Sequence, residues 1–125
     1  MNGSMIGRKL WAIPEGYIPP QSHATSRALE SHEAACLLNA GDRDAHIEIT
    51  VFFSDREPCG PYRVEVPARR TLHLRFNDLR DPVPIPRGMD YASVIVSDEP
   101  IVVQHTRLDS RQAEEALLST IAYSQ

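Results

Sequence analysis

The sequence predicts an all-β domain: a jelly-roll-like antiparallel β-sandwich of about eight strands with little helix. Short runs alternate between apolar and polar residues, which is the pattern of half-buried strands. The ten prolines stand between these runs and not inside them. Turn signals recur about every ten residues, as in sandwiches and jelly rolls. We expect one domain over residues 1–125, with residues 1–5 disordered or foreign to the domain.

Three runs in the first half of the chain are predicted strands. The first covers residues 10–13, and the second covers residues 33–39 and ends in a turn at residues 40–44. The clearest run covers residues 45–53, where successive side chains point to opposite faces. Its inward residues are predicted to be Ile47, Ile49, Val51 and Phe53.

The second half of the chain continues the pattern. Residues 62–66 and 71–76 alternate again, and the second of these runs points Leu72, Leu74 and Phe76 inward. Residues 91–97 and 101–106 are apolar on both faces, so we expect two strands that are central or covered by another subunit. The Pro-rich residues 76–88 are expected to cross from one sheet to the other.

The C-terminal segment allows two interpretations. Asp109 or Ser110 could cap a helix over residues 111–118, because both residue types favour that position. Residues 116–123 instead alternate as a last strand would. We favour one helical turn over residues 110–115 followed by a strand.

Composition and charge narrow the class of protein. A net charge of −4 and a pI of about 5.7 argue against a dedicated nucleic-acid-binding domain. No apolar stretch approaches the roughly 18 residues of a membrane span, and the N-terminus lacks the apolar region of a signal peptide. Cys36 and Cys59 form no framework pattern, so we expect two free thiols in a soluble, cytoplasmic protein.

No spacing in the chain indicates a cofactor, a metal or a catalytic centre. The five histidines lack the pairings that place two imidazoles on one ion. Nucleophile elbows and glycine-rich phosphate loops are absent from the sequence. We therefore expect no metal, no cofactor and no enzyme activity. A small hydrolase that uses Glu15 or Glu33 with His32 stays open, provided that two carboxyls converge at a cleft.

Polar side chains gather where two predicted strands end. The apolar run from Pro100 gives way to hydrogen-bonding residues up to Asp109, and Asn77 follows Phe76. Rigid scaffolds present binding groups at such ends. Arg75 or Arg107 could grip a carboxylate or vicinal hydroxyls; alternatively, Arg107 and Asp109 form a structural ion pair. The polar residues that end the longer run are Gln104, His105, Thr106, Arg107 and Asp109.

Three surface features leave further alternatives open. Trp11, near Glu15, could stack a sugar ring, although burial is the commoner use of a tryptophan. The arginines between residues 63 and 75 could bind phosphates or form an ordinary solvated face. Phe52 and Val102 lack obvious cover, which favours a homo-oligomer.

Several long blocks of the sequence resemble one known family. The most recognisable is Trp-Ala-Ile-Pro-Glu-Gly-Tyr-Ile-Pro-Pro at residues 11–20. On these blocks the chain resembles the sensory rhodopsin transducer family of the Anabaena type over residues 6–123, whereas residues 21–31 diverge from it. The other resembling blocks are residues 38–42, 60–63, 66–71, 75–79 and 102–114.

The resemblance implies a jelly-roll-like sandwich that assembles as a cyclic homotetramer. It also implies a cytoplasmic signalling protein, non-catalytic, that pairs with a microbial sensory rhodopsin, binds a small sugar-like ligand, or both. A pure protein–protein adaptor is the alternative; a DNA-binding protein or a small hydrolase is less favoured. Strand-end position and membership in the matching blocks select the candidate ligand-binding residues Trp11, Glu15, His32, Glu33, Arg75, Asn77, Gln104, His105, Arg107 and Asp109.

Overall fold

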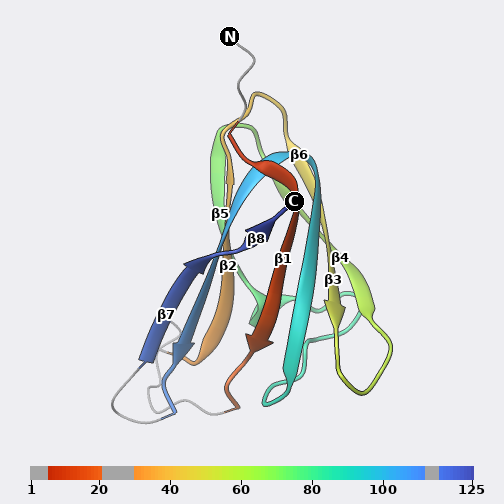
Figure 1. Ribbon diagram of the computed structural model, residues 1–125, viewed down its shortest axis with the longest axis vertical. Helices are drawn as coiled ribbons and strands as arrows, with labels where there is room; N and C mark the ends of the chain where they lie inside the picture. The colour runs from red at the N-terminus through yellow and green to blue at the C-terminus, as the bar shows by residue number, and fades with distance from the viewer. Residues whose placement is uncertain (1–5, 21–29, 112–115) are drawn as a thin grey trace.

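The computed structural model describes residues 6–20, 30–111 and 116–125, and these form two facing layers of antiparallel strands (Figure 1). One layer has the strand order β4-β3-β6-β1-β8, and the other has β5-β2-β6-β7. A single 3-10 turn, η2 (Phe76–Asp78), is the helical element of the described residues. The strands are β1 (Arg8–Tyr17), β2 (His32–Asn39), β3 (Ala45–Phe52), β4 (Cys59–Val66), β5 (Arg70–Arg75), β6 (Asp90–Asp109), β7 (Ala116–Ile121) and β8 (Tyr123–Ser124). The all-β sandwich prediction is confirmed; the jelly-roll connectivity stays a prediction.

Strand β6 belongs to both layers. Its first part pairs with β1 and β3, and its second part pairs with β2 and β7. Figure 1 shows it rising in one layer, arching over, and descending in the other. The prediction of two separate strands at residues 91–97 and 101–106 is therefore wrong, although the prediction that they are central is confirmed. Pro100 lies at the arch, where its missing N–H costs no ladder hydrogen bond.

Two other prolines also lie inside strands, contrary to the prediction that all ten stand outside them. Pro14 lies in β1 between Ile13 and Gly16, where the pairing with β6 shifts register. Pro61 lies in the edge strand β4, next to a shift in its register with β3. At irregular or edge positions no hydrogen bond of the ladder requires the proline nitrogen.

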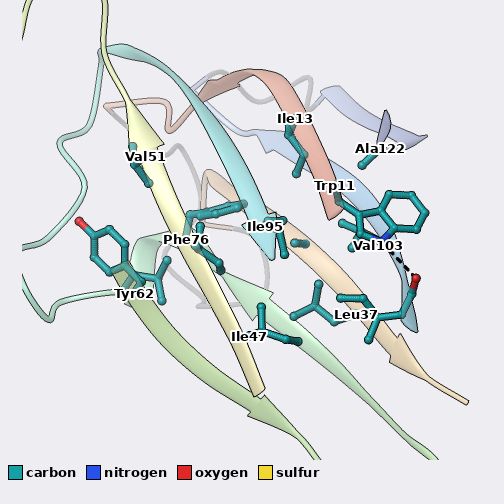
Figure 2. Packing of buried hydrophobic residues seen from close by; sticks show 14 of the residues in the cluster. Trp11, Ile13, Leu37, Ile47, Val51, Tyr62, Phe76, Ile95, Val103 and Ala122 are labelled. Carbon is teal, nitrogen blue, oxygen red and sulfur yellow. Dashed lines mark hydrogen bonds between the residues drawn. The ribbon is translucent and has the colours of Figure 1, made fainter. Parts of the chain in front are cut away.

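The hydrophobic core fills the space between the layers (Figure 2). Ile47, Ile49 and Val51 are at most 1% exposed, which confirms the predicted inward face of β3. Trp11 is also buried, and its indole N–H donates to the carbonyls of Arg8 at 2.9 Å and Ile101 at 3.1 Å. Of the inward residues predicted for β5 and its end, Phe76 is buried, and Leu72 and Leu74 pack against the core.

The segment between β5 and β6 crosses from one layer to the other, as predicted. It contributes Leu79 and Ile85 to the core. The hydroxyl of Tyr62 donates to the carbonyl of Val83 at 2.6 Å and fastens the segment to β4. Buried contacts therefore hold this Pro-rich connection in place.

The end of the chain is a strand. Residues 112–115, where most of the predicted helical turn falls, lie outside the described residues, as do residues 1–5. Strand β7 runs along the second part of β6, and the chain then crosses to β1 as β8 (Figure 1). No helix of the described residues is long and apolar enough to cross a membrane.

Candidate functional site

The ends of β1, β5 and β6 meet the beginning of β2 at one end of the sandwich (Figure 1). Antiparallel pairing produces this meeting: Glu33 near the start of β2 lies opposite Arg107 near the end of β6. His105 is two residues from Arg107 and therefore lies on the same face of β6. The topology thus brings together side chains that are more than 70 positions apart in the chain.

The centre of this end is the carboxylate of Glu33, which is fully buried. The guanidinium of Arg107 donates from Nε to Oε2 at 3.0 Å, and its Nη2 lies 3.4 Å from Oε1. His105 contacts Oε1 through Nε2 at 3.1 Å, and the backbone N–H of Tyr17 donates to the same oxygen at 2.8 Å. A buried carboxylate needs such compensation, because losing its hydration costs several kcal/mol.

Arg107 is itself held by a second contact. Its Cζ lies 5.9 Å from the centre of the Tyr17 ring, and that of Arg111 lies 5.7 Å from the same ring. Burial by itself would lower the pKa of Arg107, but the hydrogen bond and charge of Glu33 outweigh burial and raise it. Arg107 therefore stays positively charged, and its guanidinium is occupied by the contacts with Glu33 and the Tyr17 ring.

Asn77 fixes the backbone around Glu33. Its side-chain oxygen accepts the N–H of Glu33 at 3.1 Å, and its side-chain nitrogen donates to the carbonyl of Ser31 at 3.1 Å. The hydroxyl of Ser31 in turn accepts the N–H of Ser110 at 2.8 Å. These bonds tie η2, the start of β2 and the end of β6 into one unit. We call Glu33, Asn77, His105 and Arg107 the buried network.

A cavity of about 510 Å³ lies beside the buried network, between β1 and the β7–β8 segment. Its polar side chains are Glu15, His105 and Thr120, and Tyr123 borders it while 63% exposed. His105 is the link, because it lines the cavity and also contacts Glu33. The volume falls in the range of small-molecule sites. The remaining lining residues are Ile13, Pro14, Ile121 and Ala122.

Glu15 borders a second, smaller cavity. This one measures about 370 Å³ and is also lined by Phe52, Phe53 and Tyr91. Glu15 therefore borders both cavities, one lined by the start of β6 and the other by the β7–β8 segment. Among the described residues, no group of three or more His, Cys, Asp or Glu side chains could hold a metal ion.

One known protein family matches most of the chain. The family model described as Anabaena sensory rhodopsin transducer matches residues 6–124. The chain belongs to this transducer family. The match spans all eight strands and includes every residue of the buried network. The resemblance that the sequence blocks indicated is therefore confirmed.

Two solved structures resemble this member of the transducer family. The first is the Anabaena sensory rhodopsin transducer, with 62% sequence identity and a TM-score of 0.74, covering 82% of this chain and 100% of that chain. The second is Thermotoga maritima 1070, with 36% identity and a TM-score of 0.84, covering 97% of both chains. No curated protein matches the chain.

Within this transducer-family fold, five of the ten candidate residues come together. Glu33, Asn77, His105 and Arg107 form the buried network, and Glu15 joins His105 at the larger cavity. The predicted alternative of an Arg107–Asp109 ion pair is wrong, because Arg107 bonds Glu33. Asp109 instead accepts from Arg111 at 2.6 Å.

The other candidates lie elsewhere in the transducer-family fold. Trp11 is 4% exposed and packs in the core. His32 contacts the carbonyl of Glu30 through Nδ1 at 2.7 Å, and Arg75 lies 4.0 Å from the Glu30 carboxylate. Gln104 donates to the hydroxyl of Ser119 at 2.6 Å, on the opposite face of β6 from His105. Their roles in ligand binding stay predictions.

Sequence reasoning missed Tyr17, Tyr91, Thr120 and Tyr123 of this transducer-family member. Tyr17 contributes a backbone N–H and a ring face, which residue type does not reveal. The hydroxyl of Tyr91 is buried and has no hydrogen-bond partner among the described residues. Its ring lies so close to Gly16 that a Cβ there would approach Cε2 to 2.5 Å. Only the register of β1 with β6, which pairs Gly16 with Tyr91, makes this contact visible.

Proposed function

We propose that this transducer-family protein is a non-catalytic signalling protein that binds a small, polar, carbohydrate-like ligand in the larger cavity. One observation carries the proposal: the cavity beside β1 combines the polar side chains of Glu15, His105 and Thr120 with apolar neighbours. Sugar-like molecules present hydroxyls at their edges and C–H groups on their faces. A site of mixed character with a few convergent polar groups suits such a molecule.

The state of Glu33 argues against catalysis at this end. Its carboxylate is 0% exposed and accepts bonds from Tyr17, His105 and Arg107. A general acid or base must reach the proton that it transfers, and a saturated, enclosed carboxylate does not. The proposed hydrolase pairing of Glu33 with His32 also lacks support, since Glu33 contacts His105 instead. In our proposal Glu33 positions the cavity and transfers no proton.

Assembly and signalling complete the proposal. Four large apolar side chains of β7 and β8, which lie on both faces of β7, are more than 60% exposed, and we call them the apolar strip. We propose that a homo-oligomer, a tetramer by family resemblance, or the cytoplasmic face of a sensory rhodopsin covers this strip. Ile121 and Tyr123 also line the cavity, so ligand and partner would meet there. The four residues are Leu117, Leu118, Ile121 and Tyr123.

Nucleic-acid binding is not favoured by the outer face. Arg63 donates to the carboxylate of Glu48 at 3.1 Å, and Arg69 donates to that of Asp42 at 2.8 Å. These acids neutralise two of the arginines that could have met phosphates. Affinity for phosphate backbones depends on uncompensated positive charge.

Filling the cavity tests ligand binding. Thr120→Tyr places a large ring in the cavity, whereas Ser119→Tyr places the same ring on the opposite face of β7. Calorimetric titration with a panel of neutral and charged sugars should show binding to the wild type and Ser119→Tyr, and loss of binding in Thr120→Tyr. If no sugar of the panel binds to the wild type, and the protein still binds a sensory rhodopsin, the pure adaptor is favoured instead.

A further inference from the structure

We propose that the larger cavity selects ligands that donate hydrogen bonds and carry no negative charge, with amine-bearing, amino-sugar-like compounds preferred over neutral sugars and acidic sugars rejected. This inference rests on the proposed function and names the class of ligand for that site. It follows from the hydrogen-bonding state of the three polar side chains that line the cavity, Glu15, His105 and Thr120.

His105 is held in one tautomer by Glu33. Its Nε2 lies 3.1 Å from Oε1 of the Glu33 carboxylate, which also accepts from Arg107, and a carboxylate only accepts. Of the two neutral tautomers, this contact selects the one with its proton on Nε2 and its lone pair on Nδ1. No residue among those described bonds Nδ1. Because His105 lines the cavity, the nitrogen left for a ligand is an acceptor.

Thr120 also offers a hydrogen-bond acceptor to the ligand. Its hydroxyl already donates to the carbonyl of Ile121 at 3.4 Å, which leaves the oxygen lone pairs toward any other partner. Glu15 adds a carboxylate, which accepts only. All three polar side chains of the cavity thus seek hydrogen-bond donors from the ligand.

The charge around the cavity also favours a ligand that carries no negative charge. Within the buried network, the charges of Glu33 and Arg107 cancel. Glu15 forms no ion pair with another described residue, and its charge contributes to the raised pKa of Arg107. Arg111, the other nearby cation, is paired with Asp109. The uncompensated charge at the cavity is therefore the Glu15 carboxylate, which attracts an ammonium group and repels a carboxylate or phosphate.

Apolar neighbours determine what kind of amine fits. Ile13, Ala122 and Tyr123 border the same cavity as the three acceptors. A compact ring with C–H faces can pack on them while its hydroxyl and ammonium groups turn toward Glu15 and His105. A bare inorganic cation would leave the apolar lining without contact, so the geometry favours an organic amine.

Three compounds with one carbon skeleton test the inference: glucosamine, glucose and glucuronate, titrated calorimetrically into the protein at pH 7. We expect glucosamine to bind tightest and glucuronate to bind at least about tenfold more weakly than glucose. Glu15→Gln should remove the advantage of glucosamine and keep glucose binding. Glu48→Gln, an exposed acid on β3 that is paired with Arg63, should leave the ranking unchanged.

The outcomes separate this inference from the proposed function. Binding of all three sugars with equal affinity, or tightest binding of glucuronate, overturns the selectivity and leaves ligand binding in place. An amine preference that survives Glu15→Gln overturns the role given to that carboxylate. Absence of binding by all three compounds overturns the proposed site, and the selectivity falls with it.

Discussion

Nε of Arg107 lies 3.0 Å from Oε2 of Glu33, an ion pair in which the carboxylate side chain is 0% exposed and the arginine 18%. The two residues face each other in the register of β2 and β6. His105 shares the same carboxylate, so the pair is also the support of the cavity wall. Removing either partner leaves a charge in a place that water hardly reaches.

Glu33→Gln should destabilise the protein strongly. The substitution keeps the shape of the side chain but leaves the Arg107 cation without its counter-charge. Breaking a buried pair in this way costs about 3 kcal/mol or more. The free energy of unfolding, measured by urea denaturation at pH 7, should fall by that amount.

Two comparisons make the result specific to the buried pair. Glu48→Gln breaks the exposed pair with Arg63, and its effect should stay below about 1 kcal/mol. The double variant Glu33→Leu with Arg107→Met should recover much of the loss, because it removes both charges. An unfolding free energy of Glu33→Gln equal to that of the wild type would show that Arg107 is solvated in solution.

Much of the fold could be predicted because strand alternation is a local signal. The inward face of β3 follows from period-two spacing alone, and Ile47, Ile49 and Val51 confirm it. The arch of β6 at Pro100 could not be predicted in this way. Whether an apolar stretch stays in one layer depends on partners in β1 and β2, which lie far away in the sequence.

The candidate site was predictable in its location but not in its pairings. Position at strand ends led to Glu33, His105 and Arg107, which do converge. The alternative that pairs Arg107 with Asp109 rests on proximity along the chain, and it is wrong. The actual partner depends on the register between two strands 74 positions apart. Likewise, residue type alone could not distinguish a ligand-stacking Trp11 from the buried one.

The His46–Asp98 pair should make stability depend on pH. Nδ1 of His46 lies 2.9 Å from Oδ2 of Asp98, and this hydrogen bond is the main cause of the raised pKa of His46. A raised pKa in the folded state means that the protonated ring stabilises the fold below about pH 6.5, its ordinary value. That contribution is lost as the pH rises through the raised pKa.

The same pair also makes the stability of the fold fall at low pH. The backbone N–H of His46, followed by its ring, lowers the pKa of Asp98. The contribution of Asp98 is therefore present above about pH 4 and lost as the pH falls through the lowered pKa.

Urea denaturation of the wild type and His46→Gln at several pH values tests this window. The difference in unfolding free energy should be largest at about pH 5 to 6 and should shrink at about pH 8.5. His73→Gln provides the control, because His73 is exposed on β5 and forms no ion pair with another described residue. A difference that is constant over this range, or that grows with pH, would contradict the assignment.

Tyr91→Phe should leave the protein as stable as the wild type or more stable, although Tyr91 is only 4% exposed. Its hydroxyl lacks a hydrogen-bond partner among the described residues, so its desolvation destabilises the folded state and no hydrogen bond compensates for it. Burial, followed by the charge of Glu33, raises the pKa of Tyr91, and the hydroxyl stays neutral. Removing the hydroxyl should raise the unfolding free energy by up to about 1 kcal/mol.

Tyr62→Phe is the matched control: Tyr62 is 1% exposed, but its hydroxyl donates to the carbonyl of Val83 at 2.6 Å. That variant should lose about 1 kcal/mol or more, because the carbonyl of Val83 loses its partner. If both variants lose equal stability in urea denaturation, the Tyr91 hydroxyl holds a hydrogen bond in solution.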